Sequence, residues 1–251
     1  MEIFDSHLHL AQSSDLNWSF AKLTENMRLA DVSGGLIICN QNDAWDFEQV
    51  GELVGLNRNF KLAISPDLNV STRALGKAIK NWKRVGAVAL KIHPRIQKTN
   101  LQSRQVDNLV RQAQDLNMPI VICSFNDGSW SRIGMTNMQF LRLADDFPGV
   151  KFLWAHAGGH SVLDFMFMAR RVPNVFLDTS FTQSYFFKGA VLENLNYATE
   201  SLKNRFMFGT DFELDSYPES VRRLSDFYLS HNLDRTAFFV GNYKFFLGIN
   251  E

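Results

Sequence analysis

The chain of 251 residues has few cysteines, no excess of charge of either sign and no long apolar run. Its two cysteines, Cys39 and Cys123, are too few for a disulfide framework, and both end apolar runs, which is typical of reduced thiols inside a cell. Lys and Arg together number 26, and so do Asp and Glu, so no overall field favours a polyanion or an acidic membrane surface. No apolar run approaches the ~20 residues that cross a bilayer.

The N-terminal segment also lacks the pattern of a signal peptide, because it carries Glu2 and Asp5 where a basic region and an apolar region are expected. These absences predict a cytoplasmic protein that binds neither nucleic acid nor membrane. A small molecule is then the expected binding partner. A homodimer is expected from analogy at the level of the fold alone.

Short apolar runs alternate with helical patterns along the whole chain. The runs are near-continuous, which is typical of strands that are buried on both faces. Strands are expected within 1–4, 35–39, 60–64, 87–92, 119–123, 150–155, 174–178 and 205–208. Helices are expected over 19–33, 43–57, 71–85, 103–117, 137–147, 161–172, 186–202 and 218–230, with a closing helix within 235–250. This alternation predicts a single-domain α/β protein with a (β/α)₈ TIM barrel over residues 1–251, and a doubly wound open sheet is the alternative.

Two histidines, one residue apart, follow the first apolar run. Side chains at positions i and i+2 of an extended chain point to the same face, so His7 and His9 direct two imidazoles at one point. Imidazoles in this arrangement are suited to a divalent metal. Two surface histidines also fall this way by chance, so the other strand ends decide between the two interpretations.

Polar side chains stand at the ends of the later strands as well. These residues are Lys91, His93, Cys123, Ser124, His156, Asp178 and Asp211. The active site of a (β/α)₈ barrel lies at the carboxyl ends of its strands, and the last strand is adjacent to the first. Asp211 is therefore expected beside His7 and His9, where two imidazoles and a carboxylate form a divalent-metal site with open positions for water.

Some of these residues also have structural interpretations. Lys91 could contact a substrate anion or form a buried ion pair with a carboxylate. His93 could line the site or cap the end of a strand through a hydrogen bond. Asp178 suits a loop cap as well as a site role, and a buried thiol such as Cys123 is ordinary at a strand end. With these alternatives open, Lys91, His93, Ser124 and Asp178 are predicted to contact the substrate.

Five motifs together resemble the amidohydrolase superfamily. They are Phe-Asp-Ser-His-Leu-His at 4–9, Lys-Ile-His-Pro at 91–94, Trp-Ala-His-Ala-Gly-Gly at 154–159, Phe-Gly-Thr-Asp-Phe at 208–212 and Gly-Asn at 241–242. More narrowly, the chain is similar to the branch that includes decarboxylases of the carboxymuconate-semialdehyde type. The resemblance implies one divalent metal, usually zinc, held by His7, His9, Asp211 and a histidine at the fifth strand. It also implies that His156 and Asp211 move protons.

The sequence departs from this pattern at the fifth strand, where Cys123 stands in place of the expected histidine. The thiolate could ligate the metal directly, since zinc accepts sulfur. Alternatively, three protein ligands and an extra water hold the metal, or metal affinity has been lost and the barrel binds a ligand without catalysis. The sequence leaves all three outcomes open.

The leading prediction is a metal-dependent hydrolase of a small amide, ester or lactone. A zinc ion, or alternatively manganese, bound by His7, His9, Asp211 and Cys123 would activate a water molecule. Asp211 would take the water proton as general base, and His156 would stabilise or protonate the developing oxyanion. The alternative within enzymes is a non-oxidative decarboxylase, for which Lys91 or Arg95 would bind the substrate carboxylate. The alternative outside enzymes is a non-catalytic ligand-binding barrel.

Overall fold

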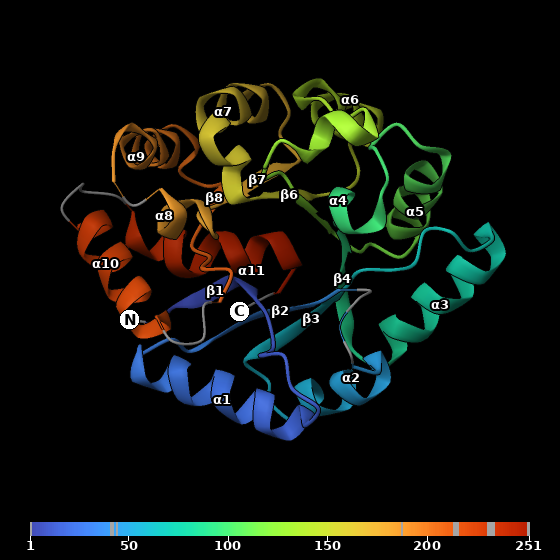
Figure 1. The fold of residues 1–251 in the computed structure, drawn as a ribbon, viewed down its shortest axis with the longest axis horizontal. Helices are drawn as coiled ribbons and strands as arrows, with labels where there is room; N and C mark the ends of the chain where they lie inside the picture. The colour runs from blue at the N-terminus through green and yellow to red at the C-terminus, as the bar shows by residue number, and fades with distance from the viewer. Residues whose placement is uncertain are drawn as a thin grey trace.

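The computed structural model describes residues 2–40, 43, 45–186, 188–212, 216–229 and 234–249. Within these residues, eight parallel strands form one sheet in the order β1 to β8, and helices surround it (Figure 1). The two edges of the sheet meet, because the Ser6 N–H donates to the Phe208 carbonyl and the Asp211 N–H donates to the His7 carbonyl, each at 3.0 Å. The prediction of a (β/α)₈ barrel is confirmed, and the sequential strand order excludes the doubly wound sheet.

The strands of this sheet are short. They are β1 (Phe4–Leu8), β2 (Gly34–Cys39), β3 (Phe60–Ile64), β4 (Ala87–Ile92), β5 (Ile120–Cys123), β6 (Phe152–Ala155), β7 (Val175–Asp178) and β8 (Phe206–Met207). The α-helices are α1 (Leu16–Leu29), α2 (Phe47–Gly55), α3 (Thr72–Arg84), α4 (Pro94–Gln97), α5 (Arg104–Asp115), α6 (Asn137–Asp146), α7 (Val162–Arg171), α8 (Thr182–Tyr185), α9 (Ala190–Leu202), α10 (Tyr217–Leu229) and α11 (Asn242–Leu247). Three short non-α helical segments are η1 (Ser129–Ile133), η2 (His156–Ser161) and η3 (Ala237–Gly241).

The first strand lies later in the sequence than predicted. The sequence placed it within 1–4, whereas β1 spans Phe4–Leu8 and includes His7. Asp5 and Ser6 are tolerated in this buried strand because both side chains make buried hydrogen bonds, Asp5 with Thr210 and Ser6 with Asp178. His9 follows the strand directly, as expected.

Three helices begin three or more positions from where the sequence predicts, and the first of them, α1, begins at Leu16 and not at 19. Helix α2 begins at Phe47 and not at 43, because the Asp46 carboxylate caps it by accepting two backbone N–H groups, while positions 41, 42 and 44 lie outside the described residues. Helix α9 begins at Ala190, after Gly189 with φ of 99°, and not at 186. The sequence also missed α4, whose first residue is Pro94 and whose cap is His93.

The hydrophobic core has two layers. The inner layer fills the barrel with one side chain from most strands and is closed at one end by Tyr243 and Phe246 of α11. The outer layer packs the helices against the sheet and is much larger. None of the described helices combines the length and the apolar character that a bilayer crossing requires. The inner packing leaves the other end of the barrel, where the strands have their carboxyl ends, for polar side chains.

Candidate active site

A small cavity of about 140 Å³ lies at the carboxyl ends of the strands. Most of the residues predicted for the site contribute to its wall. The lining residues are His7, His9, Asn40, Lys91, His93, Arg95, Cys123, Phe125, His156, Phe181 and Asp211. The barrel therefore brings side chains from both ends of the chain into one space.

His7, His9 and Asp211 converge within this cavity. The Oδ1 atom of Asp211 lies 3.1 Å from Nε2 of His7 and 3.3 Å from Nε2 of His9. The two imidazole rings lie on the same side of the chain, with centroids 5.2 Å apart. Two Nε2 atoms and one carboxylate oxygen thus point at one another, as the sequence predicted for a metal site.

The other nitrogen of each imidazole is engaged by the protein. Nδ1 of His9 lies 3.0 Å from the carbonyl oxygen of Ile38. Nδ1 of His7 lies 3.6 Å from Oδ2 of Asp178 and 3.3 Å from the Ser180 hydroxyl. These acceptors hold a proton on Nδ1 of each ring. The lone pair of each imidazole is then on Nε2, the nitrogen that faces Asp211. Histidines that ligate a metal are commonly oriented in this way, by a hydrogen bond from the ring nitrogen that does not contact the metal.

The charges at His7 and Asp211 suit a divalent cation. Burial, reinforced by the positive charge of Lys91, lowers the pKa of His7 to about 3, so its imidazole is neutral near pH 7. Burial raises the pKa of Asp211, but the adjacent imidazoles of His7 and His9 outweigh this and hold it well below its usual range. A neutral imidazole and an ionised carboxylate are the forms that bind metal. The residues present therefore fit the metal that the sequence predicted.

A second trio of potential ligands lies behind the first. His7, His156 and Asp178 offer ligand atoms that are mutually within 4.8 Å, as do His7, His9 and Asp211. All three members of the second trio are buried, however. The Asp178 carboxylate already accepts hydrogen bonds from four protein groups, the backbone N–H groups of His156 and Ser180 and the hydroxyls of Ser6 and Ser180. The trio with open access to the cavity is therefore His7, His9 and Asp211.

The backbone at Asp211 is held in an unusual conformation. Asp211 has φ of 73° and the following Phe212 has φ of 40°, a left-handed region that favours glycine. The carboxylate of Asp5 accepts hydrogen bonds from the Thr210 N–H at 3.1 Å, the Thr210 hydroxyl at 2.7 Å and the Tyr217 hydroxyl at 3.1 Å. Such conformations cost ~1–3 kcal/mol and persist where the surroundings enforce them. The Asp5–Thr210 contact thus positions the Asp211 carboxylate.

His156 follows β6 with a left-handed backbone of its own, φ 72°. Its backbone N–H donates to Oδ1 of Asp178 at 2.8 Å, and its Nδ1 lies 3.1 Å from the Ser180 carbonyl and 2.9 Å from the Ser180 hydroxyl. Burial lowers the pKa of His156, but the negative charge of Cys123 outweighs this and raises it above its usual value. His156 is therefore positioned as a proton donor at the cavity wall.

Cys123 also lines the cavity but does not belong to the converging trio. Burial raises the pKa of its thiol, but the imidazoles of His93 and His156 outweigh this and lower the pKa well below the usual value. Cys123 thus favours the thiolate form, the form in which sulfur ligates metals. Its place in a metal site stays a prediction.

Lys91 and His93 form the β4 side of the cavity. The Lys91 side chain is 1% exposed, and its Nζ lies 3.4 Å from Nε2 of His7. Among the described residues, no ion pair joins Lys91 to a carboxylate. His93 has a second role, because its Nδ1 accepts the Ile96 N–H at 3.4 Å and caps α4, whereas the structural interpretation had placed its hydrogen bond at the end of a strand.

The structure does not bring Ser124 and Asp178 into the cavity lining. The Ser124 hydroxyl donates to the Ala155 carbonyl at 2.5 Å and accepts the Gly158 N–H at 2.8 Å, so it supports the loop after β6. Asp178 likewise supports His7 and His156 from behind. Sequence reasoning placed both residues at the correct end of the barrel but assigned them to direct contact with substrate.

Sequence reasoning missed three supporting residues, Asp5, Thr210 and Ser180. Ser180 contacts His7, His156 and Asp178 through one hydroxyl. A signal for Asp5 and Thr210 was present, since both are buried polar residues beside predicted ligands. No rule of spacing, however, pairs residues that lie 205 positions apart in the chain.

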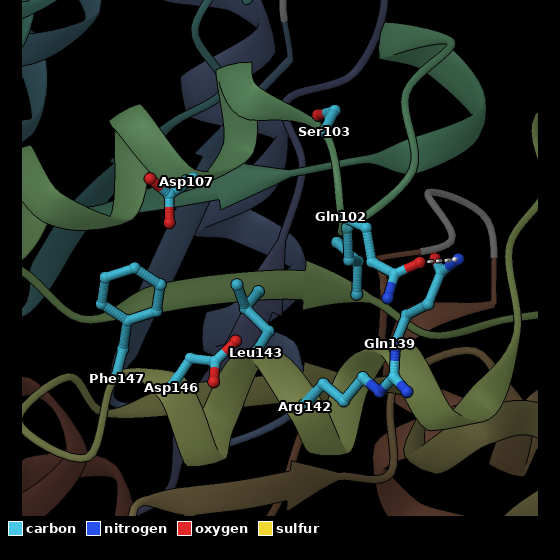
Figure 2. A pocket seen from close by; sticks show the side chains of 9 residues that line it. Gln102, Ser103, Asp107, Gln139, Arg142, Leu143, Asp146 and Phe147 are labelled. Atoms are coloured by element: carbon cyan, nitrogen blue, oxygen red, sulfur yellow. Dashed lines mark hydrogen bonds between the residues drawn. The ribbon is translucent and has the colours of Figure 1, made fainter.

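A larger hollow of about 440 Å³ lies on the outer wall between α5 and α6 (Figure 2). Its polar groups contact the protein itself, since Gln139 donates to Gln102 and to the Gly134 carbonyl, and Asp107 pairs with Arg111. None of the predicted site residues lines it. Despite its greater volume, this hollow does not have the converging ligands of the barrel mouth.

Comparison with solved structures confirms the barrel. An uncharacterised TIM-barrel protein from Bordetella bronchiseptica has a TM-score of 0.80 at 15% identity, with 99% of each chain covered. A 5-carboxyvanillate decarboxylase from Novosphingobium aromaticivorans, solved with manganese, has a TM-score of 0.61 at 13% identity, with 98% of this chain and 95% of that chain covered. A uronate isomerase from Bacillus halodurans has a TM-score of 0.61 at 16% identity, with 94% and 72% covered. At these identities the likeness shows the fold alone.

Comparison at the level of sequence gives the family. No curated protein matches the chain. A family model described as Amidohydrolase, however, matches residues 19–242, which include Lys91, His156 and Asp211. The match begins after His7 and His9, and the structure places these two histidines beside Asp211, which lies within the match. The chain belongs to the amidohydrolase family.

Proposed function

We propose that the protein is a metal-dependent hydrolase of a small amide, ester or lactone. The observation that carries the proposal is the convergence of His7 Nε2, His9 Nε2 and Asp211 Oδ1, with Nδ1 of both imidazoles engaged by the protein. These three residues would hold one divalent ion, zinc or manganese. The bound ion would act as a Lewis acid and would make a water molecule acidic enough to react near neutral pH.

Asp211 and His156 would divide the proton transfers. The low pKa of Asp211 keeps its carboxylate ionised, and its second oxygen is available to accept a proton from water. The raised pKa of His156 keeps a proton on the imidazole, and its Nδ1 is held by Ser180. Its Nε2 would therefore donate to the developing oxyanion or the leaving group.

The cavity supports a small substrate with an apolar part. Its volume of about 140 Å³ is below the range of drug-sized ligand sites. Phe125 and Phe181 form one wall. Their rings pack edge to face, with centroids 4.8 Å apart. A ring or a short aliphatic group would pack on this wall while the scissile bond faces Asp211.

The direct test is a screen of small esters, lactones and amides with zinc-loaded and manganese-loaded protein. Hydrolysis that needs added metal and disappears in Asp211→Asn would support the proposal. Hydrolysis that persists in Asp211→Asn, or in chelated protein, would contradict it.

A non-oxidative decarboxylase is the second candidate, and Lys91 is the observation that favours it. A buried ammonium without a carboxylate partner is costly, so the cavity favours a ligand that brings negative charge. Arg95 lies at the rim, where it pairs with Asp127 at 3.4 Å and could meet the same ligand. A solved neighbour is a decarboxylase of an aromatic carboxylate, which supports this candidate.

The two candidates are separated by the products and by one variant. A decarboxylase would release CO₂ from a carboxylate substrate and lose most activity in Lys91→Met. A hydrolase of neutral esters would release no CO₂ and would tolerate Lys91→Met. Activity of neither kind in metal-loaded protein would favour the non-catalytic ligand-binding barrel.

A further inference from the structure

We propose that the protein forms a homodimer in which α7 of one copy packs antiparallel on α7 of a second copy. The surface that carries this proposal is the outward face of α6 and α7, termed here the α6–α7 face. It consists of Met138, Leu141, Asp145, Asp164, Phe167, Arg170 and Arg171. The two helices lie side by side on the outer wall of the barrel (Figure 1).

The centre of the α6–α7 face is apolar and exposed. Phe167 and Met138 are each 55% exposed, and Leu141 lies between them and the core. These side chains border an open groove of about 730 Å³ whose exposed lining is mainly apolar. Clustered exposed apolar side chains with a charged rim are typical of a protein-binding surface.

The charges on α7 are arranged so that the helix complements a reversed copy of itself. Asp164 lies in the first turn, Arg170 and Arg171 lie in the last turn, and Phe167 lies midway between them. Within the described residues, no ion pair engages Arg170 or Arg171. Among the groups that the structure describes, Asp164 accepts a hydrogen bond only from Asn137, at 3.3 Å, and this bond engages one of its two carboxylate oxygens.

A two-fold axis near Phe167 would pair Asp164 with Arg171. In an antiparallel pair centred between positions 167 and 168, residue 164 faces residue 171, because the two numbers are equally far from the centre. Asp164 of each copy would then meet Arg171 of the other, and the two Phe167 rings would pack together. Each contact would occur twice, as an isologous interface requires.

This self-complementarity is the reason to choose a second copy as the occupant. An acidic partner would be repelled by Asp164, and a basic partner by Arg170 and Arg171. A copy related by the two-fold axis places opposite charges together at both ends and apolar side chains in the middle. The proposal concerns the outer wall and does not depend on the chemistry at the barrel mouth.

The test is a charge exchange, with the mass in solution measured by analytical ultracentrifugation over a wide concentration range. Wild type is expected at twice the mass of one chain. Asp164→Arg, or Arg171→Asp, would place like charges together at both ends of α7, and the dimer dissociation constant should rise by ~10-fold or more. The double variant Asp164→Arg/Arg171→Asp should restore dimerisation, because opposite charges meet again.

Phe167→Asp should also dissociate the dimer, whereas the matched control Leu56→Asp should not. Leu56 is 86% exposed at the end of α2, away from the α6–α7 face. Circular dichroism would verify that every variant is folded. A monomeric wild type, single charge variants that dimerise normally, or a double variant that stays monomeric would each overturn the proposal.

Discussion

The Nζ atom of Lys91 lies 3.4 Å from Nε2 of His7, the atom that faces the proposed metal. A divalent ion bound to Nε2 would therefore have a lysine side chain as a near neighbour. Burial lowers the pKa of Lys91, although the negative charges of Cys123 and Asp211 act in the opposite direction. Lys91 and the metal thus compete for the lone pair on Nε2 of His7.

Lys91→Met should consequently strengthen metal binding. Removal of a buried positive charge a few ångströms from the ion should lower the metal dissociation constant by ~10-fold or more. Titration calorimetry with zinc and with manganese would measure this. Arg95→Met is the matched control, because Arg95 is 58% exposed at the rim and its removal should change metal affinity little. Weaker metal binding in Lys91→Met would show that the lysine assists the site.

His156→Gln should separate catalysis from metal binding. Because His156 lies outside the trio of His7, His9 and Asp211, its loss should leave the metal content near that of wild type. The activity should fall by ~10²–10⁴-fold, the range ordinarily supplied by a positioned proton donor. Metal analysis and initial rates on the same preparation would measure both. Loss of the metal together with activity would instead make His156 a ligand.

Thr210→Val should weaken the site through Asp211. The substitution keeps the shape but removes the hydroxyl that donates to Asp5 and accepts the Phe212 N–H at 3.0 Å. We expect a loss of ~1–3 kcal/mol in the free energy of unfolding, since buried partners are left unpaired. Metal affinity should fall as well, because Asp211 loses its support.

Thr199→Val is the control for this variant. The Thr199 hydroxyl is also buried, and it donates to the Leu195 carbonyl at 2.8 Å within α9, away from the cavity. This change should reduce stability without altering metal affinity. Equal metal affinities in the two variants would contradict a positioning role for Thr210.

The barrel was predictable because its signals are local. Apolar runs and helical patterns recur in alternation, and a closed barrel of eight strands places the first strand, with His7, beside the residues that follow the last strand, with Asp211. The convergence of His7, His9 and Asp211 followed from the same topology. Short elements such as α4 and α8 were missed because four residues carry no periodic pattern.

The roles within the site were less predictable. Asp178 and Cys123 both end strands, yet one stands behind the histidines and the other faces the cavity. That difference depends on where each side chain points after the chain turns, which residue type and spacing do not specify. The left-handed backbone at His156 and Asp211 likewise depends on distant partners, Asp178 and Asp5.

The two cysteines should differ in reactivity. Burial raises the pKa of Cys39 beyond the usual range for thiols, so it should resist alkylation in the folded protein. Cys123, at the cavity and with a lowered pKa, should react with iodoacetamide near neutral pH. Peptide mass mapping would measure both rates. Because the thiolate is predicted to ligate the metal, added zinc should slow the alkylation of Cys123. An unchanged rate would contradict this role and leave His7, His9 and Asp211 as the protein ligands.

The metal content of the purified protein tests the central claim most directly. Mass spectrometry should find about one zinc or manganese ion per chain in wild type prepared without chelator and then incubated with either metal. Asp211→Ala should bind little, because one of the three converging ligands is absent. A wild type that stays free of metal under these conditions would contradict the account, and a wild type that matches Asp211→Ala would do the same.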